Sequence, residues 1–280
     1  MNPDLLPFAY AVLGLIIGSF LNVCIYRIPL GKSVVFPGSE CPHCGQPIRF
    51  YDNIPLVSYL LLRAKCRRCR VPISIRYPSV ELMTAVAFYA CARIWNFASP
   101  TYVNSLFLAV ILVLVFTDFD HRILPNVLTI PGTVAGILLS PFQQADFYAD
   151  ILSVHLAARV WPGDPFRALP WIGSIIGALV AGGLLLVVGI GYLKLRRRQG
   201  LGMGDVKMMA MVGAFLGWRL GILTIFAGSL LGTLLGVSLM VFRKMNLQTK
   251  LAFGVLLGLG AAFSLFYGLP FLSWYLGATR

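Results

Sequence analysis

Long apolar stretches recur along this chain of 280 residues, and they constrain its fold more than any other feature. A helix that crosses a bilayer needs about 20 mostly apolar residues. Hydrophobic residues make up 58% of the chain and charged residues only 12%, a balance that excludes an ordinary soluble domain. The sequence therefore predicts an all-α polytopic membrane protein with about eight transmembrane helices, near residues 7–26, 79–97, 103–118, 125–141, 170–193, 206–217, 221–242 and 251–275.

The first apolar stretch is expected to remain in the protein as a transmembrane helix. A cleaved signal peptide begins with basic residues and ends at a small-residue cleavage site. Here Asp4 is the only charged side chain before the stretch, and Asn22 to Arg27 follow it. We therefore divide the chain into a first helix, a polar cytoplasmic loop and a multi-helix membrane domain, at residues 1–26, 27–78 and 79–280.

The distribution of Lys and Arg predicts the orientation. Cytoplasmic loops of membrane proteins are enriched in both residues. With both termini outside, most of the 23 basic residues fall on the inner side, and the outside keeps only Arg93, Arg159, Arg167, Arg219 and Arg280. The net charge of +13 then reflects loops that face anionic lipid, so we expect the bilayer and not a nucleic acid as the partner.

Two cysteine pairs in the loop 27–78 predict a zinc site. Each C-x-x-C turn presents two thiolates, and four thiolates suit a tetrahedral zinc ion. A structural disulfide is disfavoured on the reducing cytoplasmic side, although a redox pair is the alternative. His43 is not expected to be a ligand. The predicted ligands of this small zinc-ribbon-like loop domain are Cys41, Cys44, Cys66 and Cys69.

Asp118 and Asp205 are the candidate catalytic residues. Each lies at the cytoplasmic edge of an apolar stretch, where an ionisable side chain points to function. Two carboxylates that share one proton supply a base to activate water and an acid to protonate the leaving amine. Gly202 and Gly204 are expected to let the backbone beside Asp205 approach its partner closely. The sequence thus predicts that the two aspartates meet and hydrolyse a peptide bond.

Other interpretations use the same residues. Asp120 competes with Asp118, but on a helix the two point in different directions. Lys207 could hold a carboxylate or a lipid phosphate. A transporter could use the aspartates to relay protons or bind a cation, and a zinc-dependent adaptor would need no chemistry. No H-E-x-x-H pattern supports a zinc protease.

The motifs together resemble the bacterial type IV prepilin leader peptidases, membrane aspartic proteases of the G-x-G-D kind that also N-methylate their product. The resemblance rests on G-S-F-L-N-V at 18–23, both C-x-x-C pairs, R-Y-P-S-V-E-L at 76–82, D-F-D-H-R-I-L-P-N at 118–126 and G-M-G-D-V-K at 202–207. It assigns catalysis to Asp118 and Asp205. Asn126 stands where many members have Asp, and residues 251–254 match the family's late Pro-Phe-Gly motif only loosely.

The resemblance also implies the substrate and a second reaction. Prepilins or pseudopilins would lose a short basic leader at the cytoplasmic face of the bacterial inner membrane. The new N-terminus would then receive a methyl group from S-adenosylmethionine, with zinc in a structural role. Glu81 is a candidate for this second reaction, with an interhelical anchor as its alternative. Residues 142–169, expected outside as a loop or interfacial segment, have no predicted role.

Overall fold

The computed structural model describes residues 5–160, 165–197, 201–243, 252–275 and 277. Within those ranges the regular elements are helices, accompanied by two isolated β-bridges, so the predicted all-α fold is confirmed. The chain divides into two compact units, Met1–Val113 and Leu114–Arg280. The α-helices are α1 (Leu6–Arg27), α2 (Val57–Leu61), α3 (Arg76–Trp95), α4 (Ser99–His121), α5 (Asn126–Leu139), α6 (Ile151–Val160), α7 (Pro165–Arg196), α8 (Met203–Arg243) and α9 (Phe253–Tyr275); the 3-10 helices are η1 (Phe50–Asn53), η2 (Ser140–Phe142) and η3 (Ala145–Phe147).

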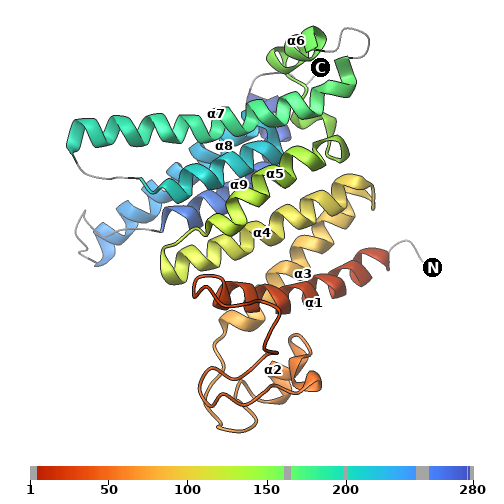
Figure 1. Ribbon diagram of the computed structural model, residues 1–280, viewed down its shortest axis with the longest axis vertical. Helices are drawn as coiled ribbons and strands as arrows, with labels where there is room; N and C mark the ends of the chain where they lie inside the picture. The colour runs from red at the N-terminus through yellow and green to blue at the C-terminus, as the bar shows by residue number, and fades with distance from the viewer. Residues whose placement is uncertain (1–4, 161–164, 198–200, 244–251, 276, 278–280) are drawn as a thin grey trace. The chain divides into compact units, whose positions relative to one another are not determined.

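In the first unit, α1 and α3 pack closely because glycines line their contact (Figure 1). A β-carbon added at Gly14 would lie 2.8 Å from the Cα of Ala85, and one added at Gly18 would lie 2.7 Å from the Cα of Glu81. Small residues one turn apart allow this close approach of two helices in lipid. The polar loop that follows α1 returns to the start of α3.

In the second unit, α8 packs against α5, α7 and α9 and is itself interrupted (Figure 1). Gly217 has φ 76° and ψ 170°, which no helix accommodates. A β-carbon added at Gly221 would lie 3.6 Å from the Cα of Gly213, although a straight helix would separate these two residues by about 12 Å. The chain therefore folds back at Gly217 into two antiparallel segments, 203–216 and 218–243.

The segment 142–169 supplies the cap of this reversal, a role that the sequence did not reveal. The hydroxyl of Tyr148 lies 3.0 Å from the carbonyl oxygen of Ala214 and 2.9 Å from that of Phe215. Both carbonyls end the first segment of α8 and have no further helical turn to bond. Tyr148 is 1% exposed, so its hydroxyl satisfies acceptors that water does not reach. The same segment contains α6, where a loop or interfacial segment was expected.

Five helices among the described residues are long and apolar enough to cross a membrane, which makes the protein multi-pass. They lie at Leu6–Arg27, Ser99–His121, Ala168–Arg196, Met203–Val241 and Phe253–Tyr275. The count of eight stays a prediction. The expected spans 206–217 and 221–242 fall in one continuous element that reverses at Gly217, and α5 has only 14 residues.

Candidate active site and zinc loop

Asp118 lies in the last turn of α4, whose end is fixed by the next residues. Arg122 takes a left-handed conformation with φ 55°, its amide bonds the carbonyl of Asp118 at 2.8 Å, and Pro125 follows. This sequence of a left-handed residue and a proline ends a helix. Asp118 is 6% exposed, whereas the competing Asp120 is exposed on another face. The structure therefore buries the aspartate that the sequence analysis chose.

The start of α9 holds the carboxylate of Asp118. The amide of Val255, in the first turn of α9, donates a hydrogen bond of 3.2 Å to Oδ2 of Asp118. A β-carbon added at the neighbouring Gly254 would lie 2.8 Å from the same oxygen. Unpaired amides and the positive end of the helix dipole stabilise a carboxylate at this place. Gly254 thus leaves the space that lets Asp118 reach the helix start.

Asp205 lies in the first turn of α8, and like Asp118 it accepts a hydrogen bond from a backbone amide at a helix start. The amide of Gly202 donates a hydrogen bond of 3.2 Å to its Oδ2, an arrangement like half of a capping box. Asp205 is 8% exposed. Both aspartates are therefore largely buried, and the carboxylate of each accepts a hydrogen bond at the start of a helix, α9 for Asp118 and α8 for Asp205, which limits how far either carboxylate can turn.

The structure brings Asp118 and Asp205 together at one end of the second unit. The two carboxylates are close enough to interact electrostatically. Leu124, in the connection from α4 to α5, contacts the glycine beside each of them: its Cβ lies 2.9 Å from a β-carbon built at Gly204, and its Cδ1 lies 3.1 Å from one built at Gly254. Two neighbouring buried carboxylates favour a state in which they share one proton. This arrangement can supply both a base and an acid.

The four predicted zinc ligands form one cluster in the first unit. Their sulfur atoms all lie within 4.8 Å of one another, and the sulfurs of Cys41 and Cys69 are 3.9 Å apart. A tetrahedral zinc ion with bonds of about 2.3 Å places its sulfur ligands about 3.8 Å apart. The residues therefore fit zinc. Within the described part of the chain, this is the group of side chains that could hold a metal ion, and His43 is not in it.

The two halves of the cluster repeat one backbone pattern. The amides of Cys41 and Cys66 bond the carbonyls of Gln46 and Val71, each at 2.9 Å. Isolated β-bridges follow at equivalent positions, Glu40 with Pro47 and Lys65 with Pro72. The amides of Cys69 and Arg68 lower the pKa of the Cys66 thiol to about 7, which favours the thiolate that zinc binds. Two equivalent turns therefore each present a pair of sulfurs.

Two family models match the chain, one in each half. The description "Bacterial Peptidase A24 N-terminal domain" matches residues 12–96, and "Type IV leader peptidase family" matches residues 105–237. A protein of Aeromonas hydrophila named prepilin leader peptidase/N-methyltransferase is 32% identical over 97% of this chain and 95% of its own length. The chain belongs to the type IV leader peptidase family.

Further relatives carry the same name. The protein of Pseudomonas aeruginosa is 32% identical over 92% of this chain and 89% of its own length. The protein of Myxococcus xanthus is 39% identical over 82% of this chain, and the match spans 62% of that longer relative. No solved structure matches the chain. As a member of this family with several apolar helices, the protein is a membrane-bound peptidase.

Three residues of this leader peptidase family member lie against the aspartates although the sequence analysis did not select them. Val255 donates to Asp118, Gly254 makes room for it, and Leu124 contacts the glycines of both sites. Phe253-Gly254 carried a weak signal, because it matches the end of the family's late motif. Leu124 lies within the motif at 118–126, but nothing in that motif distinguished it from the neighbouring Ile123 as the side chain that reaches both glycines.

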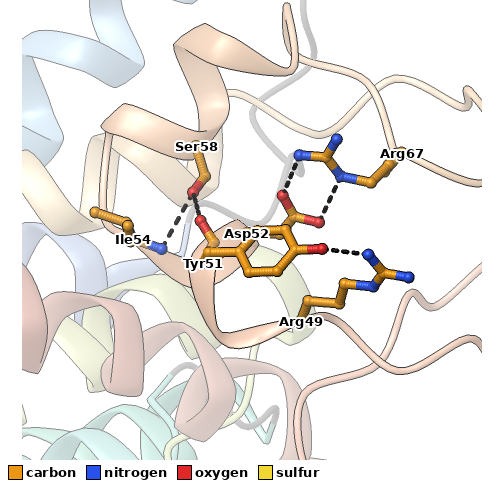
Figure 2. Close-up of polar contacts among 6 residues, drawn as sticks. All are labelled: Arg49, Tyr51, Asp52, Ile54, Ser58 and Arg67. Atoms are coloured by element: carbon orange, nitrogen blue, oxygen red, sulfur yellow. Dashed lines mark hydrogen bonds and ion pairs between the residues drawn. The ribbon is translucent and has the colours of Figure 1, made fainter.

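Polar contacts tie the segment before α2 to the second cysteine turn (Figure 2). The guanidinium of Arg67 makes two hydrogen bonds to the carboxylate of Asp52, of 2.7 and 2.6 Å. This partner holds the pKa of Asp52 below its ordinary value. Figure 2 also shows Arg49 donating to the hydroxyl of Tyr51, and Ser58 joining the carbonyl of Tyr51 to the amide of Ile54. The contacts brace the loop around the zinc ligands.

Glu81 lies under this loop in the first unit. It is 8% exposed, and its Oε2 accepts a hydrogen bond of 2.9 Å from the amide of Leu56. A pocket of about 530 Å³ lies between α1 and the loop, with Ser19, Arg27 and Asn53 among its lining residues. The guanidinium of Arg27 is committed to loop carbonyls, including those of Pro37 and Gly38. Glu81 therefore anchors the loop to α3.

Proposed function

We propose that Asp118 and Asp205 are the catalytic residues of this peptidase and hydrolyse the peptide bond between the leader and the mature part of a prepilin or pseudopilin. One carboxylate removes a proton from a water molecule, whose oxygen attacks the scissile carbonyl carbon. The other carboxyl group protonates the leaving amine as the C–N bond breaks. The observation that carries the proposal is the burial of both aspartates side by side, each with its carboxylate at the start of a helix.

The hydrogen bonds at the two helix starts support this chemistry. The amides of Val255 and Gly202 each donate a hydrogen bond to Oδ2 of one carboxylate. Acids fixed in this way need little reorganisation when the reaction begins. Asp120 is exposed to solvent, so we assign it no part in proton transfer.

The side of the membrane follows from the basic residues. The excess of Lys and Arg supports an orientation with both termini outside and the aspartate pair at the cytoplasmic face of the bacterial inner membrane. A substrate helix in the bilayer would then present its leader to the pair at the inner interface. Under this proposal the peptidase domain extends over residues 79–280, after the first helix at 1–26.

We assign the second reaction, N-methylation of the new terminus, to the first unit. Its loop 27–78 carries the cysteine cluster, and Cys41, Cys44, Cys66 and Cys69 would hold a structural zinc ion. The relatives are named N-methyltransferases, and we propose S-adenosylmethionine as the methyl donor. Glu81, buried beneath the loop, is the proposed polar contributor from α3.

Leader removal can be tested with purified protein in lipid nanodiscs. Asp118→Asn and Asp205→Asn should each lower cleavage of a prepilin peptide at least about 100-fold, because neither amide can transfer the proton. Asp120→Asn is the matched control and should retain most activity. Mass spectrometry locates the cut. Wild-type rates in both Asn variants would refute the aspartate mechanism, and proton-driven flux without cleavage would favour a transporter.

Methyl transfer needs a separate test. The mature peptide is incubated with isotopically labelled S-adenosylmethionine, and the label on its N-terminal residue is measured. Glu81→Gln should lower the label while the cleavage rate is kept. Equal labelling by this variant and the wild type would contradict a role for Glu81 in the second reaction.

A further inference from the structure

Leu124 lies between the two helix starts that hold the aspartates. Its Cβ approaches Gly204, the residue before Asp205, and its Cδ1 approaches Gly254, the residue before Val255. Both contacts are so short that a single methyl group on either glycine would displace Leu124. The side chain therefore fills the space between the start of α8 and the start of α9.

A second contact fixes the same connection two residues later. The Nζ of Lys207, in the second turn of α8, donates a hydrogen bond of 2.8 Å to Oδ1 of Asn126, the first residue of α5. Lys207 also follows Asp205 closely in the sequence. The connection from α4 to α5 is thus held at two points against the helix that carries Asp205.

These contacts link the two aspartates mechanically. Asp118 lies in the last turn of α4, and the connection that Leu124 and Asn126 anchor begins after His121. Asp205 begins α8, which both anchors touch. A change in either anchor would move the end of α4 relative to the start of α8, and the separation of the carboxylates with it.

We propose that Leu124 and the Lys207–Asn126 hydrogen bond are positioning elements that set the separation of Asp118 and Asp205. Leu124 acts as a spacer that keeps the starts of α8 and α9 apart, and the hydrogen bond holds the connection against α8. The inference rests on the proposed aspartate mechanism. Two carboxylates must share one proton around one water molecule, and a misplacement of about 1 Å can lower a rate by about 100-fold.

The first test changes the spacer. Leu124→Ala should lower kcat at least about tenfold and change KM less than about threefold, because the substrate still binds while the acids are misplaced. Leu124→Met, which conserves the volume, should stay within about threefold of the wild type. Val127→Ala is the matched control, since Val127 lies three residues after Leu124 and is 63% exposed.

The pH profile separates positioning from simple loss of folded protein. Two carboxylates that interact strongly give a broad bell-shaped profile of kcat/KM. Because Leu124→Ala removes the spacer, the starts of α8 and α9 should approach each other, the two carboxylates should interact more strongly, and the bell should become broader. A variant that only unfolds in part would lower the height of the bell and leave its width unchanged. That result would refute the role of Leu124 as a spacer.

The second test is a double-mutant cycle on the hydrogen bond. Lys207→Met and Asn126→Leu should each lower kcat about tenfold, and the double variant should lose little more than either single variant. Asn126→Asp should rescue or keep activity, because a carboxylate accepts the same hydrogen bond. Lys194→Met is the control for a lost basic charge. Additive losses, or a loss in Asn126→Asp, would show that the two side chains do not act together.

The two proposals fail in different ways. If Asp118→Asn and Asp205→Asn abolish cleavage while all the Leu124, Lys207 and Asn126 variants behave as the wild type, only the positioning inference is wrong. If the aspartate variants cleave normally, the proposed aspartate mechanism is wrong as well as the positioning inference.

Discussion

At the scale of single residues, the site depends on where side chains are absent as much as on where they are present. Gly254 is the sharpest case, because the carboxylate of Asp118 occupies the space that a β-carbon would take. Gly204 likewise admits Leu124. The sequence analysis expected the glycines near Asp205 to allow close approach. In the structure Gly204 does allow a close approach, and the group that approaches it is the apolar side chain of Leu124.

Gly254→Ala should lower kcat at least about tenfold, because the new methyl group would lie 2.8 Å from Oδ2 of Asp118 and push the carboxylate away from the amide of Val255. Gly183→Ala is the control, since no atom lies within 4 Å of a β-carbon there. Steady-state cleavage rates and thermal unfolding of both variants provide the comparison. Normal kcat in Gly254→Ala would mean that the carboxylate does not need this space.

Arg67 offers a prediction on pH. Its guanidinium holds the pKa of Asp52 below the ordinary value, so the ion pair stabilises the loop above the unfolded pKa of about 3.9. This stability is lost as the pH falls through the lower folded pKa. Arg67→Met should therefore destabilise the loop at pH 6 but not at pH 2.

The expected difference is small, because Arg67 is 51% exposed and solvent weakens the pair. Hydrogen exchange of the loop amides at the two pH values measures it. Arg68→Met is the control, since Arg68 is exposed and its substitution removes the same charge. An equal effect of both variants would point to net charge and away from the ion pair.

At the scale of elements, the reversal of α8 shows how a segment without a predicted role stabilises the peptidase unit. Tyr148→Phe removes a hydroxyl that bonds the carbonyls of Ala214 or Phe215 in a buried site. Because Ser174 also donates to the carbonyl of Ala214, the loss should be that of a typical hydrogen bond, about 1 kcal/mol. The thermal midpoint of the purified protein should fall, whereas Tyr267→Phe, at a residue 63% exposed, should leave it unchanged. An unchanged midpoint in Tyr148→Phe would show that the cap contributes nothing.

The loop 27–78 is a second element, and the packing of apolar side chains contributes little to its stability. Many of its large apolar residues are exposed, including Phe36, Phe50 and Leu61. We expect elemental analysis to find one zinc ion per chain and Cys66→Ser to lower that content strongly. Cys91→Ala should keep the metal, because Cys91 lies buried in α3 away from the cluster. Zinc-free wild-type protein would contradict the assignment.

At the scale of the whole molecule, the cysteine cluster and the aspartate pair belong to different compact units. A Cys41→Ser, Cys66→Ser variant should therefore lower methyl transfer at least about tenfold while cleavage stays within about threefold, because the unit that holds the aspartates keeps its packing. Both reactions are measured on the same preparation with the prepilin peptide. Parallel loss of both would show that the units depend on one another for folding.

The helical membrane fold, the cluster of four cysteines and the two candidate aspartates could be predicted from the sequence, because apolar length, C-x-x-C turns and charge at span edges are local patterns. Only the tertiary structure decided that α9 holds Asp118, that α8 reverses at Gly217, and that Leu124 lies between the two helix starts. Those features arise where segments distant in the chain meet. No periodicity within one segment can encode which backbone amide or side chain arrives from another.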